Sequence, residues 1–432
     1  MSTSRSTPAA PATILAGPLP WLRAASPTQR RTLLAASLGW MLDSFDVMLY
    51  ALVVTRVRAD LHMSAGTAGL IMSATLVAAA VGGTLFGRLA DRFGRTRALS
   101  ASILVYCVCT GLCGLVHTPL QLALCRIALG FGMGGEWAAG AALVAESWPD
   151  EHRGKALALV QSSWAVGYAL GAALVALVLP HFGWRPVFFL GVLPALFTFW
   201  IRRRVQEPEI WRAEAALSGN KPASLRLLFQ GPLALRTLSA TSMNAATLFA
   251  WWGLFFWVPA FLSGSPAHGG RGLGVVQTSS WTILMQVGSL LGYISFGYLA
   301  DRFGRKPTYI GYLLMAALVV QFYARAQSAE ALLWLGPVVG FWGSGYFSGF
   351  AVIASELFPT SIRASAMGFT YNTGRVVSAA APYVVGRASE SSGIGPALTI
   401  TSVAFLVAAL IALTVPETLR RVNRPDCLES TL

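Results

Sequence analysis

The stretch Gly87-Arg88-Leu89-Ala90-Asp91-Arg92-Phe93-Gly94-Arg95 decides the fold, because the chain carries it twice. Its second copy is Gly297-Tyr298-Leu299-Ala300-Asp301-Arg302-Phe303-Gly304-Arg305, and positions 91 and 301 give an offset of 210. The same offset relates Glu146 to Glu356, Pro149 to Pro359, Arg153 to Arg363 and Glu207 to Glu417. Landmarks that share one register indicate two structurally related halves joined in tandem.

The composition is that of a membrane protein. Of the 432 residues, 55% are hydrophobic and 12% are charged, which is about half the charged fraction of an ordinary soluble domain. The mean hydropathy is +0.60. In hydrocarbon the backbone must satisfy its own hydrogen bonds, so only helices or a closed barrel can span a bilayer. The apolar runs are continuous instead of alternating, which predicts an all-α integral membrane protein.

Several function classes are excluded by the sequence. The net charge of +14 lies mostly in loops between apolar runs, which is a topology signal and not a nucleic-acid-binding surface. The chain has no Walker loop, no zinc-type Cys/His cluster and no Gly-x-Ser-x-Gly elbow. We therefore expect neither an enzyme nor an ATP-driven pump, and no cofactor. The five cysteines match no disulfide framework and are interpreted as small buried hydrophobes.

Twelve apolar runs are long enough to span a bilayer. They cover residues 33–54, 64–86, 98–116, 120–145, 156–180, 185–201, 237–262, 275–299, 308–325, 330–355, 364–385 and 395–415. We predict six-helix bundles at 31–201 and 236–416, a disordered tail at 1–30 and a short tail at 417–432. The connection at 202–235 is interpreted as a solvated linker whose basic face touches anionic lipid, and a regulatory role is the alternative.

The distribution of Lys and Arg predicts the orientation. Of the 32 such residues, 24 lie in the tails, the linker and the loops on the side of the N-terminus, and 6 lie in the opposite loops. The other two, Arg126 and Arg375, fall within spans. By the positive-inside rule both termini lie in the cytoplasm, in a multi-pass protein of the cytoplasmic (inner) membrane.

The repeated stretch resembles the G-x-L-a-D-r-x-G-r-k motif of the major facilitator superfamily, which lies between the second and third helices and again between the eighth and ninth. The resemblance extends from about residue 30 to 418 and implies two pseudo-symmetric six-helix bundles. It also implies a cytoplasmic conformational latch of ion pairs, and a purely structural loop anchor is the alternative. The residues assigned to this latch are Gly87, Asp91, Arg92, Gly94, Arg95, Glu146, Arg153, Asp301, Arg302, Arg305, Glu356 and Arg363.

Shorter stretches resemble the organic-acid transporters of that superfamily. Asp43-Ser44-Phe45-Asp46 is similar to the D-G-F-D signature of proton symporters for organic acids. Gly134-Gly135-Glu136-Trp137 looks like the G-G-E-W-G stretch of sialate and monocarboxylate members. Ser44 and Ala138 stand where glycine is usual, and the aromatic-acid symporters are the near alternative. The fifth span lacks the Gly-Pro pair usual in antiporters, which argues against drug efflux.

We expect the residues that bind cargo and protons at positions where the two halves differ, because features present in both halves serve both alike. The offset pairs Asp43 with Gly253, Asp46 with Phe256, Arg126 with Gly336, Glu136 with Tyr346, and Arg375 with Ala165. Each charge at mid-bilayer costs about 2.5–3.5 kcal/mol, so five unpaired charges would cost on the order of 12–18 kcal/mol. Such groups persist when they pair with one another, which is a structural role, or when they face water and cargo, which is a functional one.

The two kinds of charge predict two roles. Asp43 and Asp46 stand three residues apart on one helix face, and we hypothesise that this pair, or one member with Glu136, is the proton-coupling site. Arg126 and Arg375 come from different halves, and a guanidinium matches a carboxylate in bidentate geometry. These arginines are therefore the candidates for binding an anionic cargo.

Uncharged side chains complete the candidate site. The possible hydrogen-bond partners of the cargo are Tyr50, Gln161, Asn244, Gln286, Tyr371 and Asn372. Helix–helix association is the alternative role for each of them. The seventh span also carries the aromatic residues Trp251, Trp252, Phe255, Phe256 and Trp257. We expect these rings to face lipid or the membrane interface, and the alternative is that some of them line the cavity.

Together these features predict a monomeric secondary active transporter that imports a small organic anion with protons by alternating access. A proton-independent facilitator, an exporter of organic acids and a sensor derived from a transporter are the alternatives.

Overall fold

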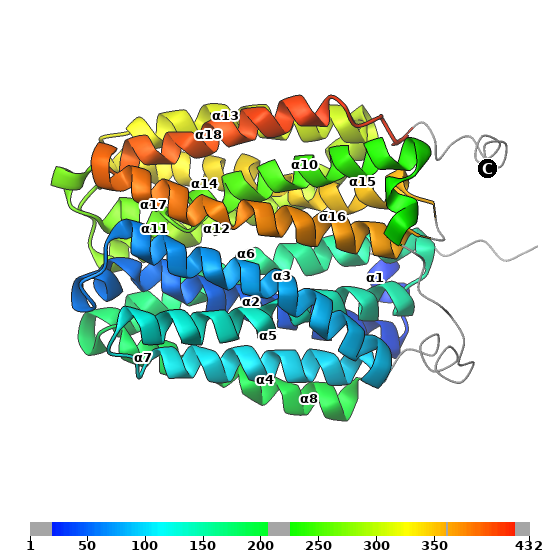
Figure 1. Ribbon diagram of the computed structural model, residues 1–432, viewed down its shortest axis with the longest axis horizontal. Helices are drawn as coiled ribbons and strands as arrows, with labels where there is room; N and C mark the ends of the chain where they lie inside the picture. The colour runs from blue at the N-terminus through cyan, green and yellow to red at the C-terminus, as the bar shows by residue number, and fades with distance from the viewer. Residues whose placement is uncertain (1–19, 206–224, 360–361, 420–432) are drawn as a thin grey trace, which may run out of the picture.

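The computed structural model describes residues 20–205, 225–359 and 362–419. Within these ranges the chain forms helices and no strands, arranged as two bundles side by side (Figure 1). The described chain begins and ends at the same end of the molecule, as an even number of spans requires (Figure 1). We call the opposite end, where α7 lies, the outer end.

The helix order follows the predicted spans. The N-terminal bundle contains α1 (Pro20–Ala24), α2 (Pro27–Asp60), α3 (Ala65–Phe93), α4 (Arg95–Cys113), α5 (Pro119–Ser147), α6 (Asp150–Phe182), α7 (Arg185–Leu190), η1 (Leu193–Leu196) and α8 (Phe197–Arg204). The C-terminal bundle contains η2 (Leu225–Phe229), α10 (Gly231–Phe255), α11 (Val258–Ser263), η3 (Pro266–His268), α12 (Val275–Phe303), α13 (Arg305–Arg325), α14 (Ala329–Gly345), α15 (Phe347–Leu357), α16 (Arg363–Ser378), α17 (Ala380–Ser392) and α18 (Ile394–Ala412). Nine segments of the described part are long and apolar enough to cross a membrane. The other three expected spans are α5, α7 with α8, and α16 with α17.

Four of the expected spans are interrupted, and these interruptions were not predicted from the sequence. Three of the interruptions follow one rule: α7, α10 and α16 end four residues before Pro194, Pro259 and Pro382. Proline has no N–H to donate to the carbonyl four residues earlier, and its ring crowds that carbonyl, so the helix breaks there. The prolines thus set where these spans bend.

The predicted repeat is confirmed in three dimensions. Helix α3 spans residues 65–93 and α12 spans 275–303, so both ends agree with an offset of 210. The glycine that follows each helix has almost the same backbone conformation, φ 109° and ψ 149° at Gly94 and φ 103° and ψ 153° at Gly304. A positive φ is strained for residues with a Cβ, which explains why glycine ends both copies of the stretch.

Close helix packing repeats with the same register. A Cβ placed on Gly82 would lie 2.1 Å from the carbonyl oxygen of Phe131, and one on Gly292 would lie 2.3 Å from that of Phe341. These distances are too short for a real Cβ, so the helices approach with backbone against backbone. The fourth span also approaches its neighbour closely at Gly134, where a Cβ would lie 1.8 Å from the carbonyl oxygen of Ala79.

We expect Gly340→Ala to destabilise the protein. Its methyl group would lie 2.0 Å from the carbonyl oxygen of Met285, so α12 and α14 must separate, at a cost of about 1–3 kcal/mol typical of overpacking. Gly311→Ala is the matched control, because nothing lies within 4 Å of its Cβ position. Thermal unfolding of the detergent-purified variants measures the difference. Equal melting temperatures would contradict the proposed close packing.

Candidate functional site

Five charged side chains lie in the interior of the molecule. Asp43 and Asp46 of α2, Arg126 and Glu136 of α5, and Arg375 of α16 are each at most 2% exposed. No two of them approach within the 4.0 Å of an ion pair, and several of their polar atoms have no hydrogen-bond partner. The structural alternative of mutual ion pairing is therefore not realised in this structure. The five groups interact only at longer range.

Asp43 interacts at long range with each of the other four charges of this cluster. The charges of Arg375, from the C-terminal bundle, and Arg126 both act on it. Asp43 in turn acts on the two other acids, Glu136 and Asp46. Of the three acids, Asp43 is therefore the one whose surroundings include charge from both halves.

Asp46 lies deeper within the N-terminal bundle. A Cβ on Gly191 would come within 3.0 Å of its Oδ1 atom and 2.4 Å of the Thr110 methyl group. Neither carboxylate oxygen of Asp46 has a hydrogen-bond partner. The two aspartates were expected to form one carboxylate pair. Their charges do interact, but their surroundings differ: Asp46 lies beside Gly191 near Thr110 of α4, whereas the charge of Arg375 from the other bundle acts on Asp43.

Glu136 is fitted against α2 at a glycine. A Cβ on Gly39 would overlap the Glu136 Oε1 atom at 2.3 Å, so this position accommodates the carboxylate only because it lacks a side chain. Gly39 stands one helical turn before Asp43, so Glu136 of α5 lies against α2 about one turn from Asp43. The Oε2 atom of Glu136 has no hydrogen-bond partner.

Arg126 lies within the N-terminal bundle, and some of its hydrogen-bond donors have no partner. Its Nη2 atom lies 3.4 Å from the Val47 carbonyl oxygen and 3.4 Å from Met72 Sδ, and its guanidinium lies 4.9 Å from the ring centre of Tyr50. The Nε and Nη1 atoms have no partner. The Tyr50 hydroxyl donates to the Ala68 carbonyl at 3.2 Å. Tyr50 therefore supports Arg126 with its ring, and its hydroxyl is already occupied.

Arg375 has the equivalent arrangement in the C-terminal bundle. It lies 5.0 Å from the ring centre of Tyr371, one turn earlier on α16, and donates to the Tyr371 hydroxyl at 3.3 Å. Its Nε atom has no partner. Each half thus contributes one arginine that stacks on a tyrosine and retains unsatisfied donors.

The remaining polar candidates have different surroundings. Asn244 donates to the carbonyl oxygens of Thr370 and Tyr371 at 3.4 and 3.3 Å, which is a helix–helix contact between α10 and α16. Gln286 is buried and its Nε2 atom has no partner. The Oδ1 atom of Asn372 lies 3.2 Å from the Cβ position of Gly83, so Asn372 contacts the opposite bundle. Gln161 is half-buried on α6.

The aromatic residues of the seventh span are buried, so the expectation that they face lipid or the interface is wrong. All five rings are at most 3% exposed, because α10 packs against α16 and α18 of its own bundle and α11 packs against α2 of the other. Trp251 and Trp252 lie 5.7 and 6.1 Å from Trp164 of α6, and Trp164 lies 4.8 Å from Trp40 of α2. We call these four residues the tryptophan cluster. Trp164 was not among the residues predicted from the sequence, although the offset of 210 pairs it with Gly374 and so marks it as unique to one half.

The latch residues form one repeated ion pair. Arg95 binds Glu146 through Nε and Nη2, the latter at 2.8 Å from Oε1, and the equivalent Arg305 Nε lies 3.5 Å from Glu356 Oε1. Arg305 also pairs with Asp301. Both repeated pairs join helices of a single bundle. The guanidinium groups of Arg92 and Arg302 stack on the adjacent phenylalanines. The side chains of Asp91, Arg153 and Arg363 lie outside the described residues.

Glu417 completes the C-terminal copy of the latch. Its carboxylate accepts the backbone N–H groups of Arg305, Lys306 and Leu419 at 3.0, 3.0 and 2.9 Å, and thereby caps α13. Burial raises the pKa of Glu417, but these backbone donors outweigh it and hold the pKa below its ordinary value of 4.5. Its predicted equivalent, Glu207, lies outside the described residues.

Comparison with known proteins places this geometry in a wider group. The family model described as Major Facilitator Superfamily matches residues 36–274 and 266–428. The "Probable 4-methylmuconolactone transporter" of Cupriavidus pinatubonensis is 34% identical, over 92% of this chain and 93% of that protein. The niacin transporter NiaP of Acinetobacter baylyi is 29% identical, over 81% and 84%. Among solved structures, a D-xylose-proton symporter has the same fold, with a TM-score of 0.72 and 20% identity over 90% of this chain and 99% of that one.

We expect Glu417→Ala to destabilise the protein by about 0.5–2 kcal/mol, as loss of a helix cap does. Because the folded-state pKa of Glu417 is depressed, the stabilisation is complete well above pH 4.5 and is lost as the pH falls through the folded value. The difference in melting temperature between wild type and variant should therefore be constant near neutral pH and shrink in acid. A difference that stays constant down to pH 3 would contradict an ionised cap.

Proposed function

The chain belongs to the major facilitator superfamily, and from this membership and the charge cluster we propose that it imports a small organic carboxylate together with protons by alternating access. The observation that carries the proposal is the set of two buried arginines and three buried acids, drawn from both halves and lacking ion pairs. Arg126 and Arg375 would bind the cargo carboxylate. Asp43 would load the proton, with Glu136 and Asp46 beside it.

The charges of the cluster support coupling. With all three acids ionised, the two arginines leave one net negative charge, and a bound carboxylate would make it two. In a low-dielectric interior such an excess is costly, so cargo binding favours the uptake of a proton by an adjacent acid. By linkage the proton favours cargo binding to the same extent. Asp43 is suited to this role because the charges of both arginines act on it.

The cargo that we propose is a flat carboxylic acid. The tryptophan cluster begins at Trp40, three residues before Asp43, and continues through Trp164 to the C-terminal bundle. Indole rings favour stacking against planar groups. The Trp164 Nε1 atom has no hydrogen-bond partner and is available to a polar group on the cargo. The relative named as a niacin transporter supports this choice, since niacin is an aromatic carboxylic acid.

The proposal extends to the orientation of the protein in the membrane and to its oligomeric state. The bias of Lys and Arg toward one side supports a protein of the cytoplasmic membrane with both termini in the cytoplasm. One chain supplies both arginines and all three acids, so we expect a monomer to transport. We keep the predicted division into bundles at 31–201 and 236–416, joined by the linker at 202–235. No enzyme activity is expected of such a chain.

Asp43→Asn should abolish uphill accumulation, because the amide cannot carry the coupling proton. In proteoliposomes with an inward proton gradient, we expect wild type to concentrate nicotinate or benzoate, and a protonophore to collapse that accumulation. The variant should retain exchange of cargo and lose at least about tenfold in accumulation, as expected for removal of an essential proton carrier. Asp60→Asn is the matched control on the same helix, since Asp60 is exposed and pairs with Arg185 at the outer end.

Three outcomes would contradict this proposal. Undiminished accumulation by Asp43→Asn would remove Asp43 from coupling. Equilibration without accumulation by wild type would indicate a proton-independent facilitator, and a folded protein without flux would indicate a sensor.

Trp164→Leu should weaken transport of flat acids selectively. Loss of one aromatic contact costs about 0.5–1.5 kcal/mol, which is roughly a two- to tenfold rise in KM. We expect this rise for nicotinate and benzoate, little change for lactate, and no effect in Trp334→Leu, where the ring is exposed on α14. Competition by a panel that includes lactate and sialic acid measures the preference. Equal losses for all acids would contradict a stacking role.

A further inference from the structure

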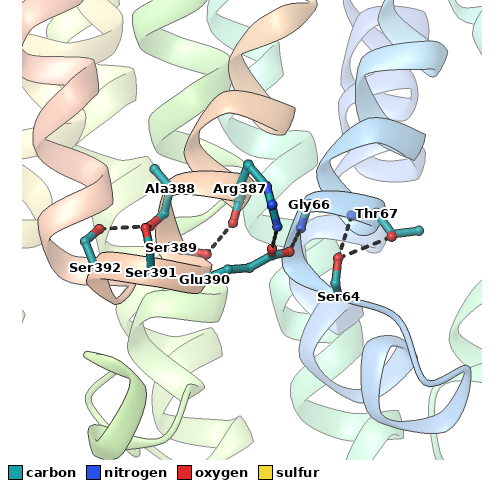
Figure 2. A network of polar contacts seen from close by, with 10 residues as sticks. Ser64, Gly66, Thr67, Arg387, Ala388, Ser389, Glu390, Ser391 and Ser392 are labelled. Atoms are coloured by element: carbon teal, nitrogen blue, oxygen red, sulfur yellow. Dashed lines mark hydrogen bonds and ion pairs between the residues drawn. The ribbon is translucent and has the colours of Figure 1, made fainter.

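A seam between α3 and α17 joins the two bundles at the outer end (Figure 2). Glu390, near the end of α17, accepts a hydrogen bond from the backbone N–H of Gly66 at 2.7 Å. Gly66 is the second residue of α3, so its N–H has no partner within the helix. The carboxylate of one bundle therefore caps a helix of the other, and the positive end of that helix favours the negative charge.

Neighbouring residues fix this carboxylate in place. Arg387, one turn earlier on α17, forms an ion pair with Glu390 (Figure 2). The charge of Arg58 at the end of α2 also acts on Glu390. Ser64 accepts the next available N–H, that of Thr67, at 3.1 Å. The first turn of α3 thus has one cap from its own chain segment and one from the opposite bundle.

The backbones meet closely along the same seam. A Cβ on Gly69 would lie 2.2 Å from the carbonyl oxygen of Pro382, and one on Gly386 would lie 2.6 Å from that of Ala65. Contact of this kind over more than one helical turn leaves no space for cargo or water between the helices. The outer end is closed along this seam.

The other hydrogen bonds between the bundles lie toward the same end. In the described part of the chain they are the contact of Thr55 with Ser263 at 3.2 Å and the bond from Tyr168 to the Phe255 carbonyl at 2.9 Å. Both involve two neutral groups, whereas Glu390 is a charged acceptor of a backbone donor. Hydrogen bonds to charged groups are the stronger kind.

We propose that Glu390 is the outer-gate residue of this transporter: its cap on α3 holds the outward-closed state, and its release from Gly66 accompanies opening to the outside. This assignment rests on the proposed alternating-access function. It requires no particular cargo and no proton coupling.

The test measures access from outside in the absence of cargo. A reporter, Ala65→Cys, lies at the seam and is 3% exposed. Its modification by a membrane-impermeant maleimide added to intact cells should be about tenfold faster when Glu390→Ala is also present. Modification of the same protein without the reporter gives the background from the native cysteines. Glu330→Gln, an acid at the outer end in the first turn of α14, is the matched control and should not change the rate.

A second variant keeps the result interpretable if Glu390→Ala does not fold. Glu390→Gln retains a side-chain oxygen for Gly66 and loses the charge, so its labelling rate should lie between those of wild type and alanine. Arg387→Gln removes the ion pair that helps to fix the carboxylate but leaves the cap itself, so it should accelerate labelling less than Glu390→Ala does. Labelling of folded Glu390→Ala or Glu390→Gln no faster than in Glu330→Gln would overturn the proposal. Because labelling requires no transport, that outcome is distinct from failure of the proposed cargo or coupling.

Discussion

Burying charge in a medium of low dielectric constant is the constraint on which this structure depends. Five ionisable groups lie inside the bundles, and no two of them are close enough to neutralise each other as an ion pair. Each arginine instead stacks on a tyrosine and keeps unsatisfied donors. A cluster in this condition gains more from an added carboxylate and proton than one that is already paired. The missing ion pairs are therefore the strongest reason to place cargo at this site.

The repeated features have a different task. The pairs Arg95–Glu146 and Arg305–Glu356, and the glycine-mediated contacts of α3 with α5 and of α12 with α14, each lie within one bundle. They make each half a rigid unit, because interfaces packed with backbone against backbone deform little. Helix packing between the halves also repeats, since α3 packs on α17 and α12 packs on α6, but the polar contacts there do not: the offset pairs Glu390 with Pro180 and Gly66 with Val276. Stability within each half and movement between them are thus assigned to separate sets of residues.

The sequence predicted the parts of the fold that depend on composition and local chemistry. Hydropathy located the spans, and the offset of 210 predicted the ends of α12 from those of α3. The sequence could not distinguish Asp43 from Asp46. A spacing of three residues puts both on one helix face but gives no information about the side chains that neighbouring helices place beside each of them. The sequence also predicted the wrong environment for Trp251 and Trp252, since aromatic residues at the membrane interface and between bundles have the same composition. Glu390 was missed because its partner, Gly66, is a backbone group in the other half.

The outer seam and the charge cluster are connected through packed side chains. Trp257 donates to the Pro382 carbonyl on α17 at 2.9 Å, and its ring lies 5.0 Å from that of Phe256. Phe256 lies 5.6 Å from Tyr50, the ring that supports Arg126. When α17 leaves α3, either these contacts move together or one of them must break, because a close-packed interior has no space to absorb the change. An anion that occupies Arg126 therefore acts on the same packed series of residues that ends at the gate, which gives cargo binding a physical means of influencing whether the outer end opens.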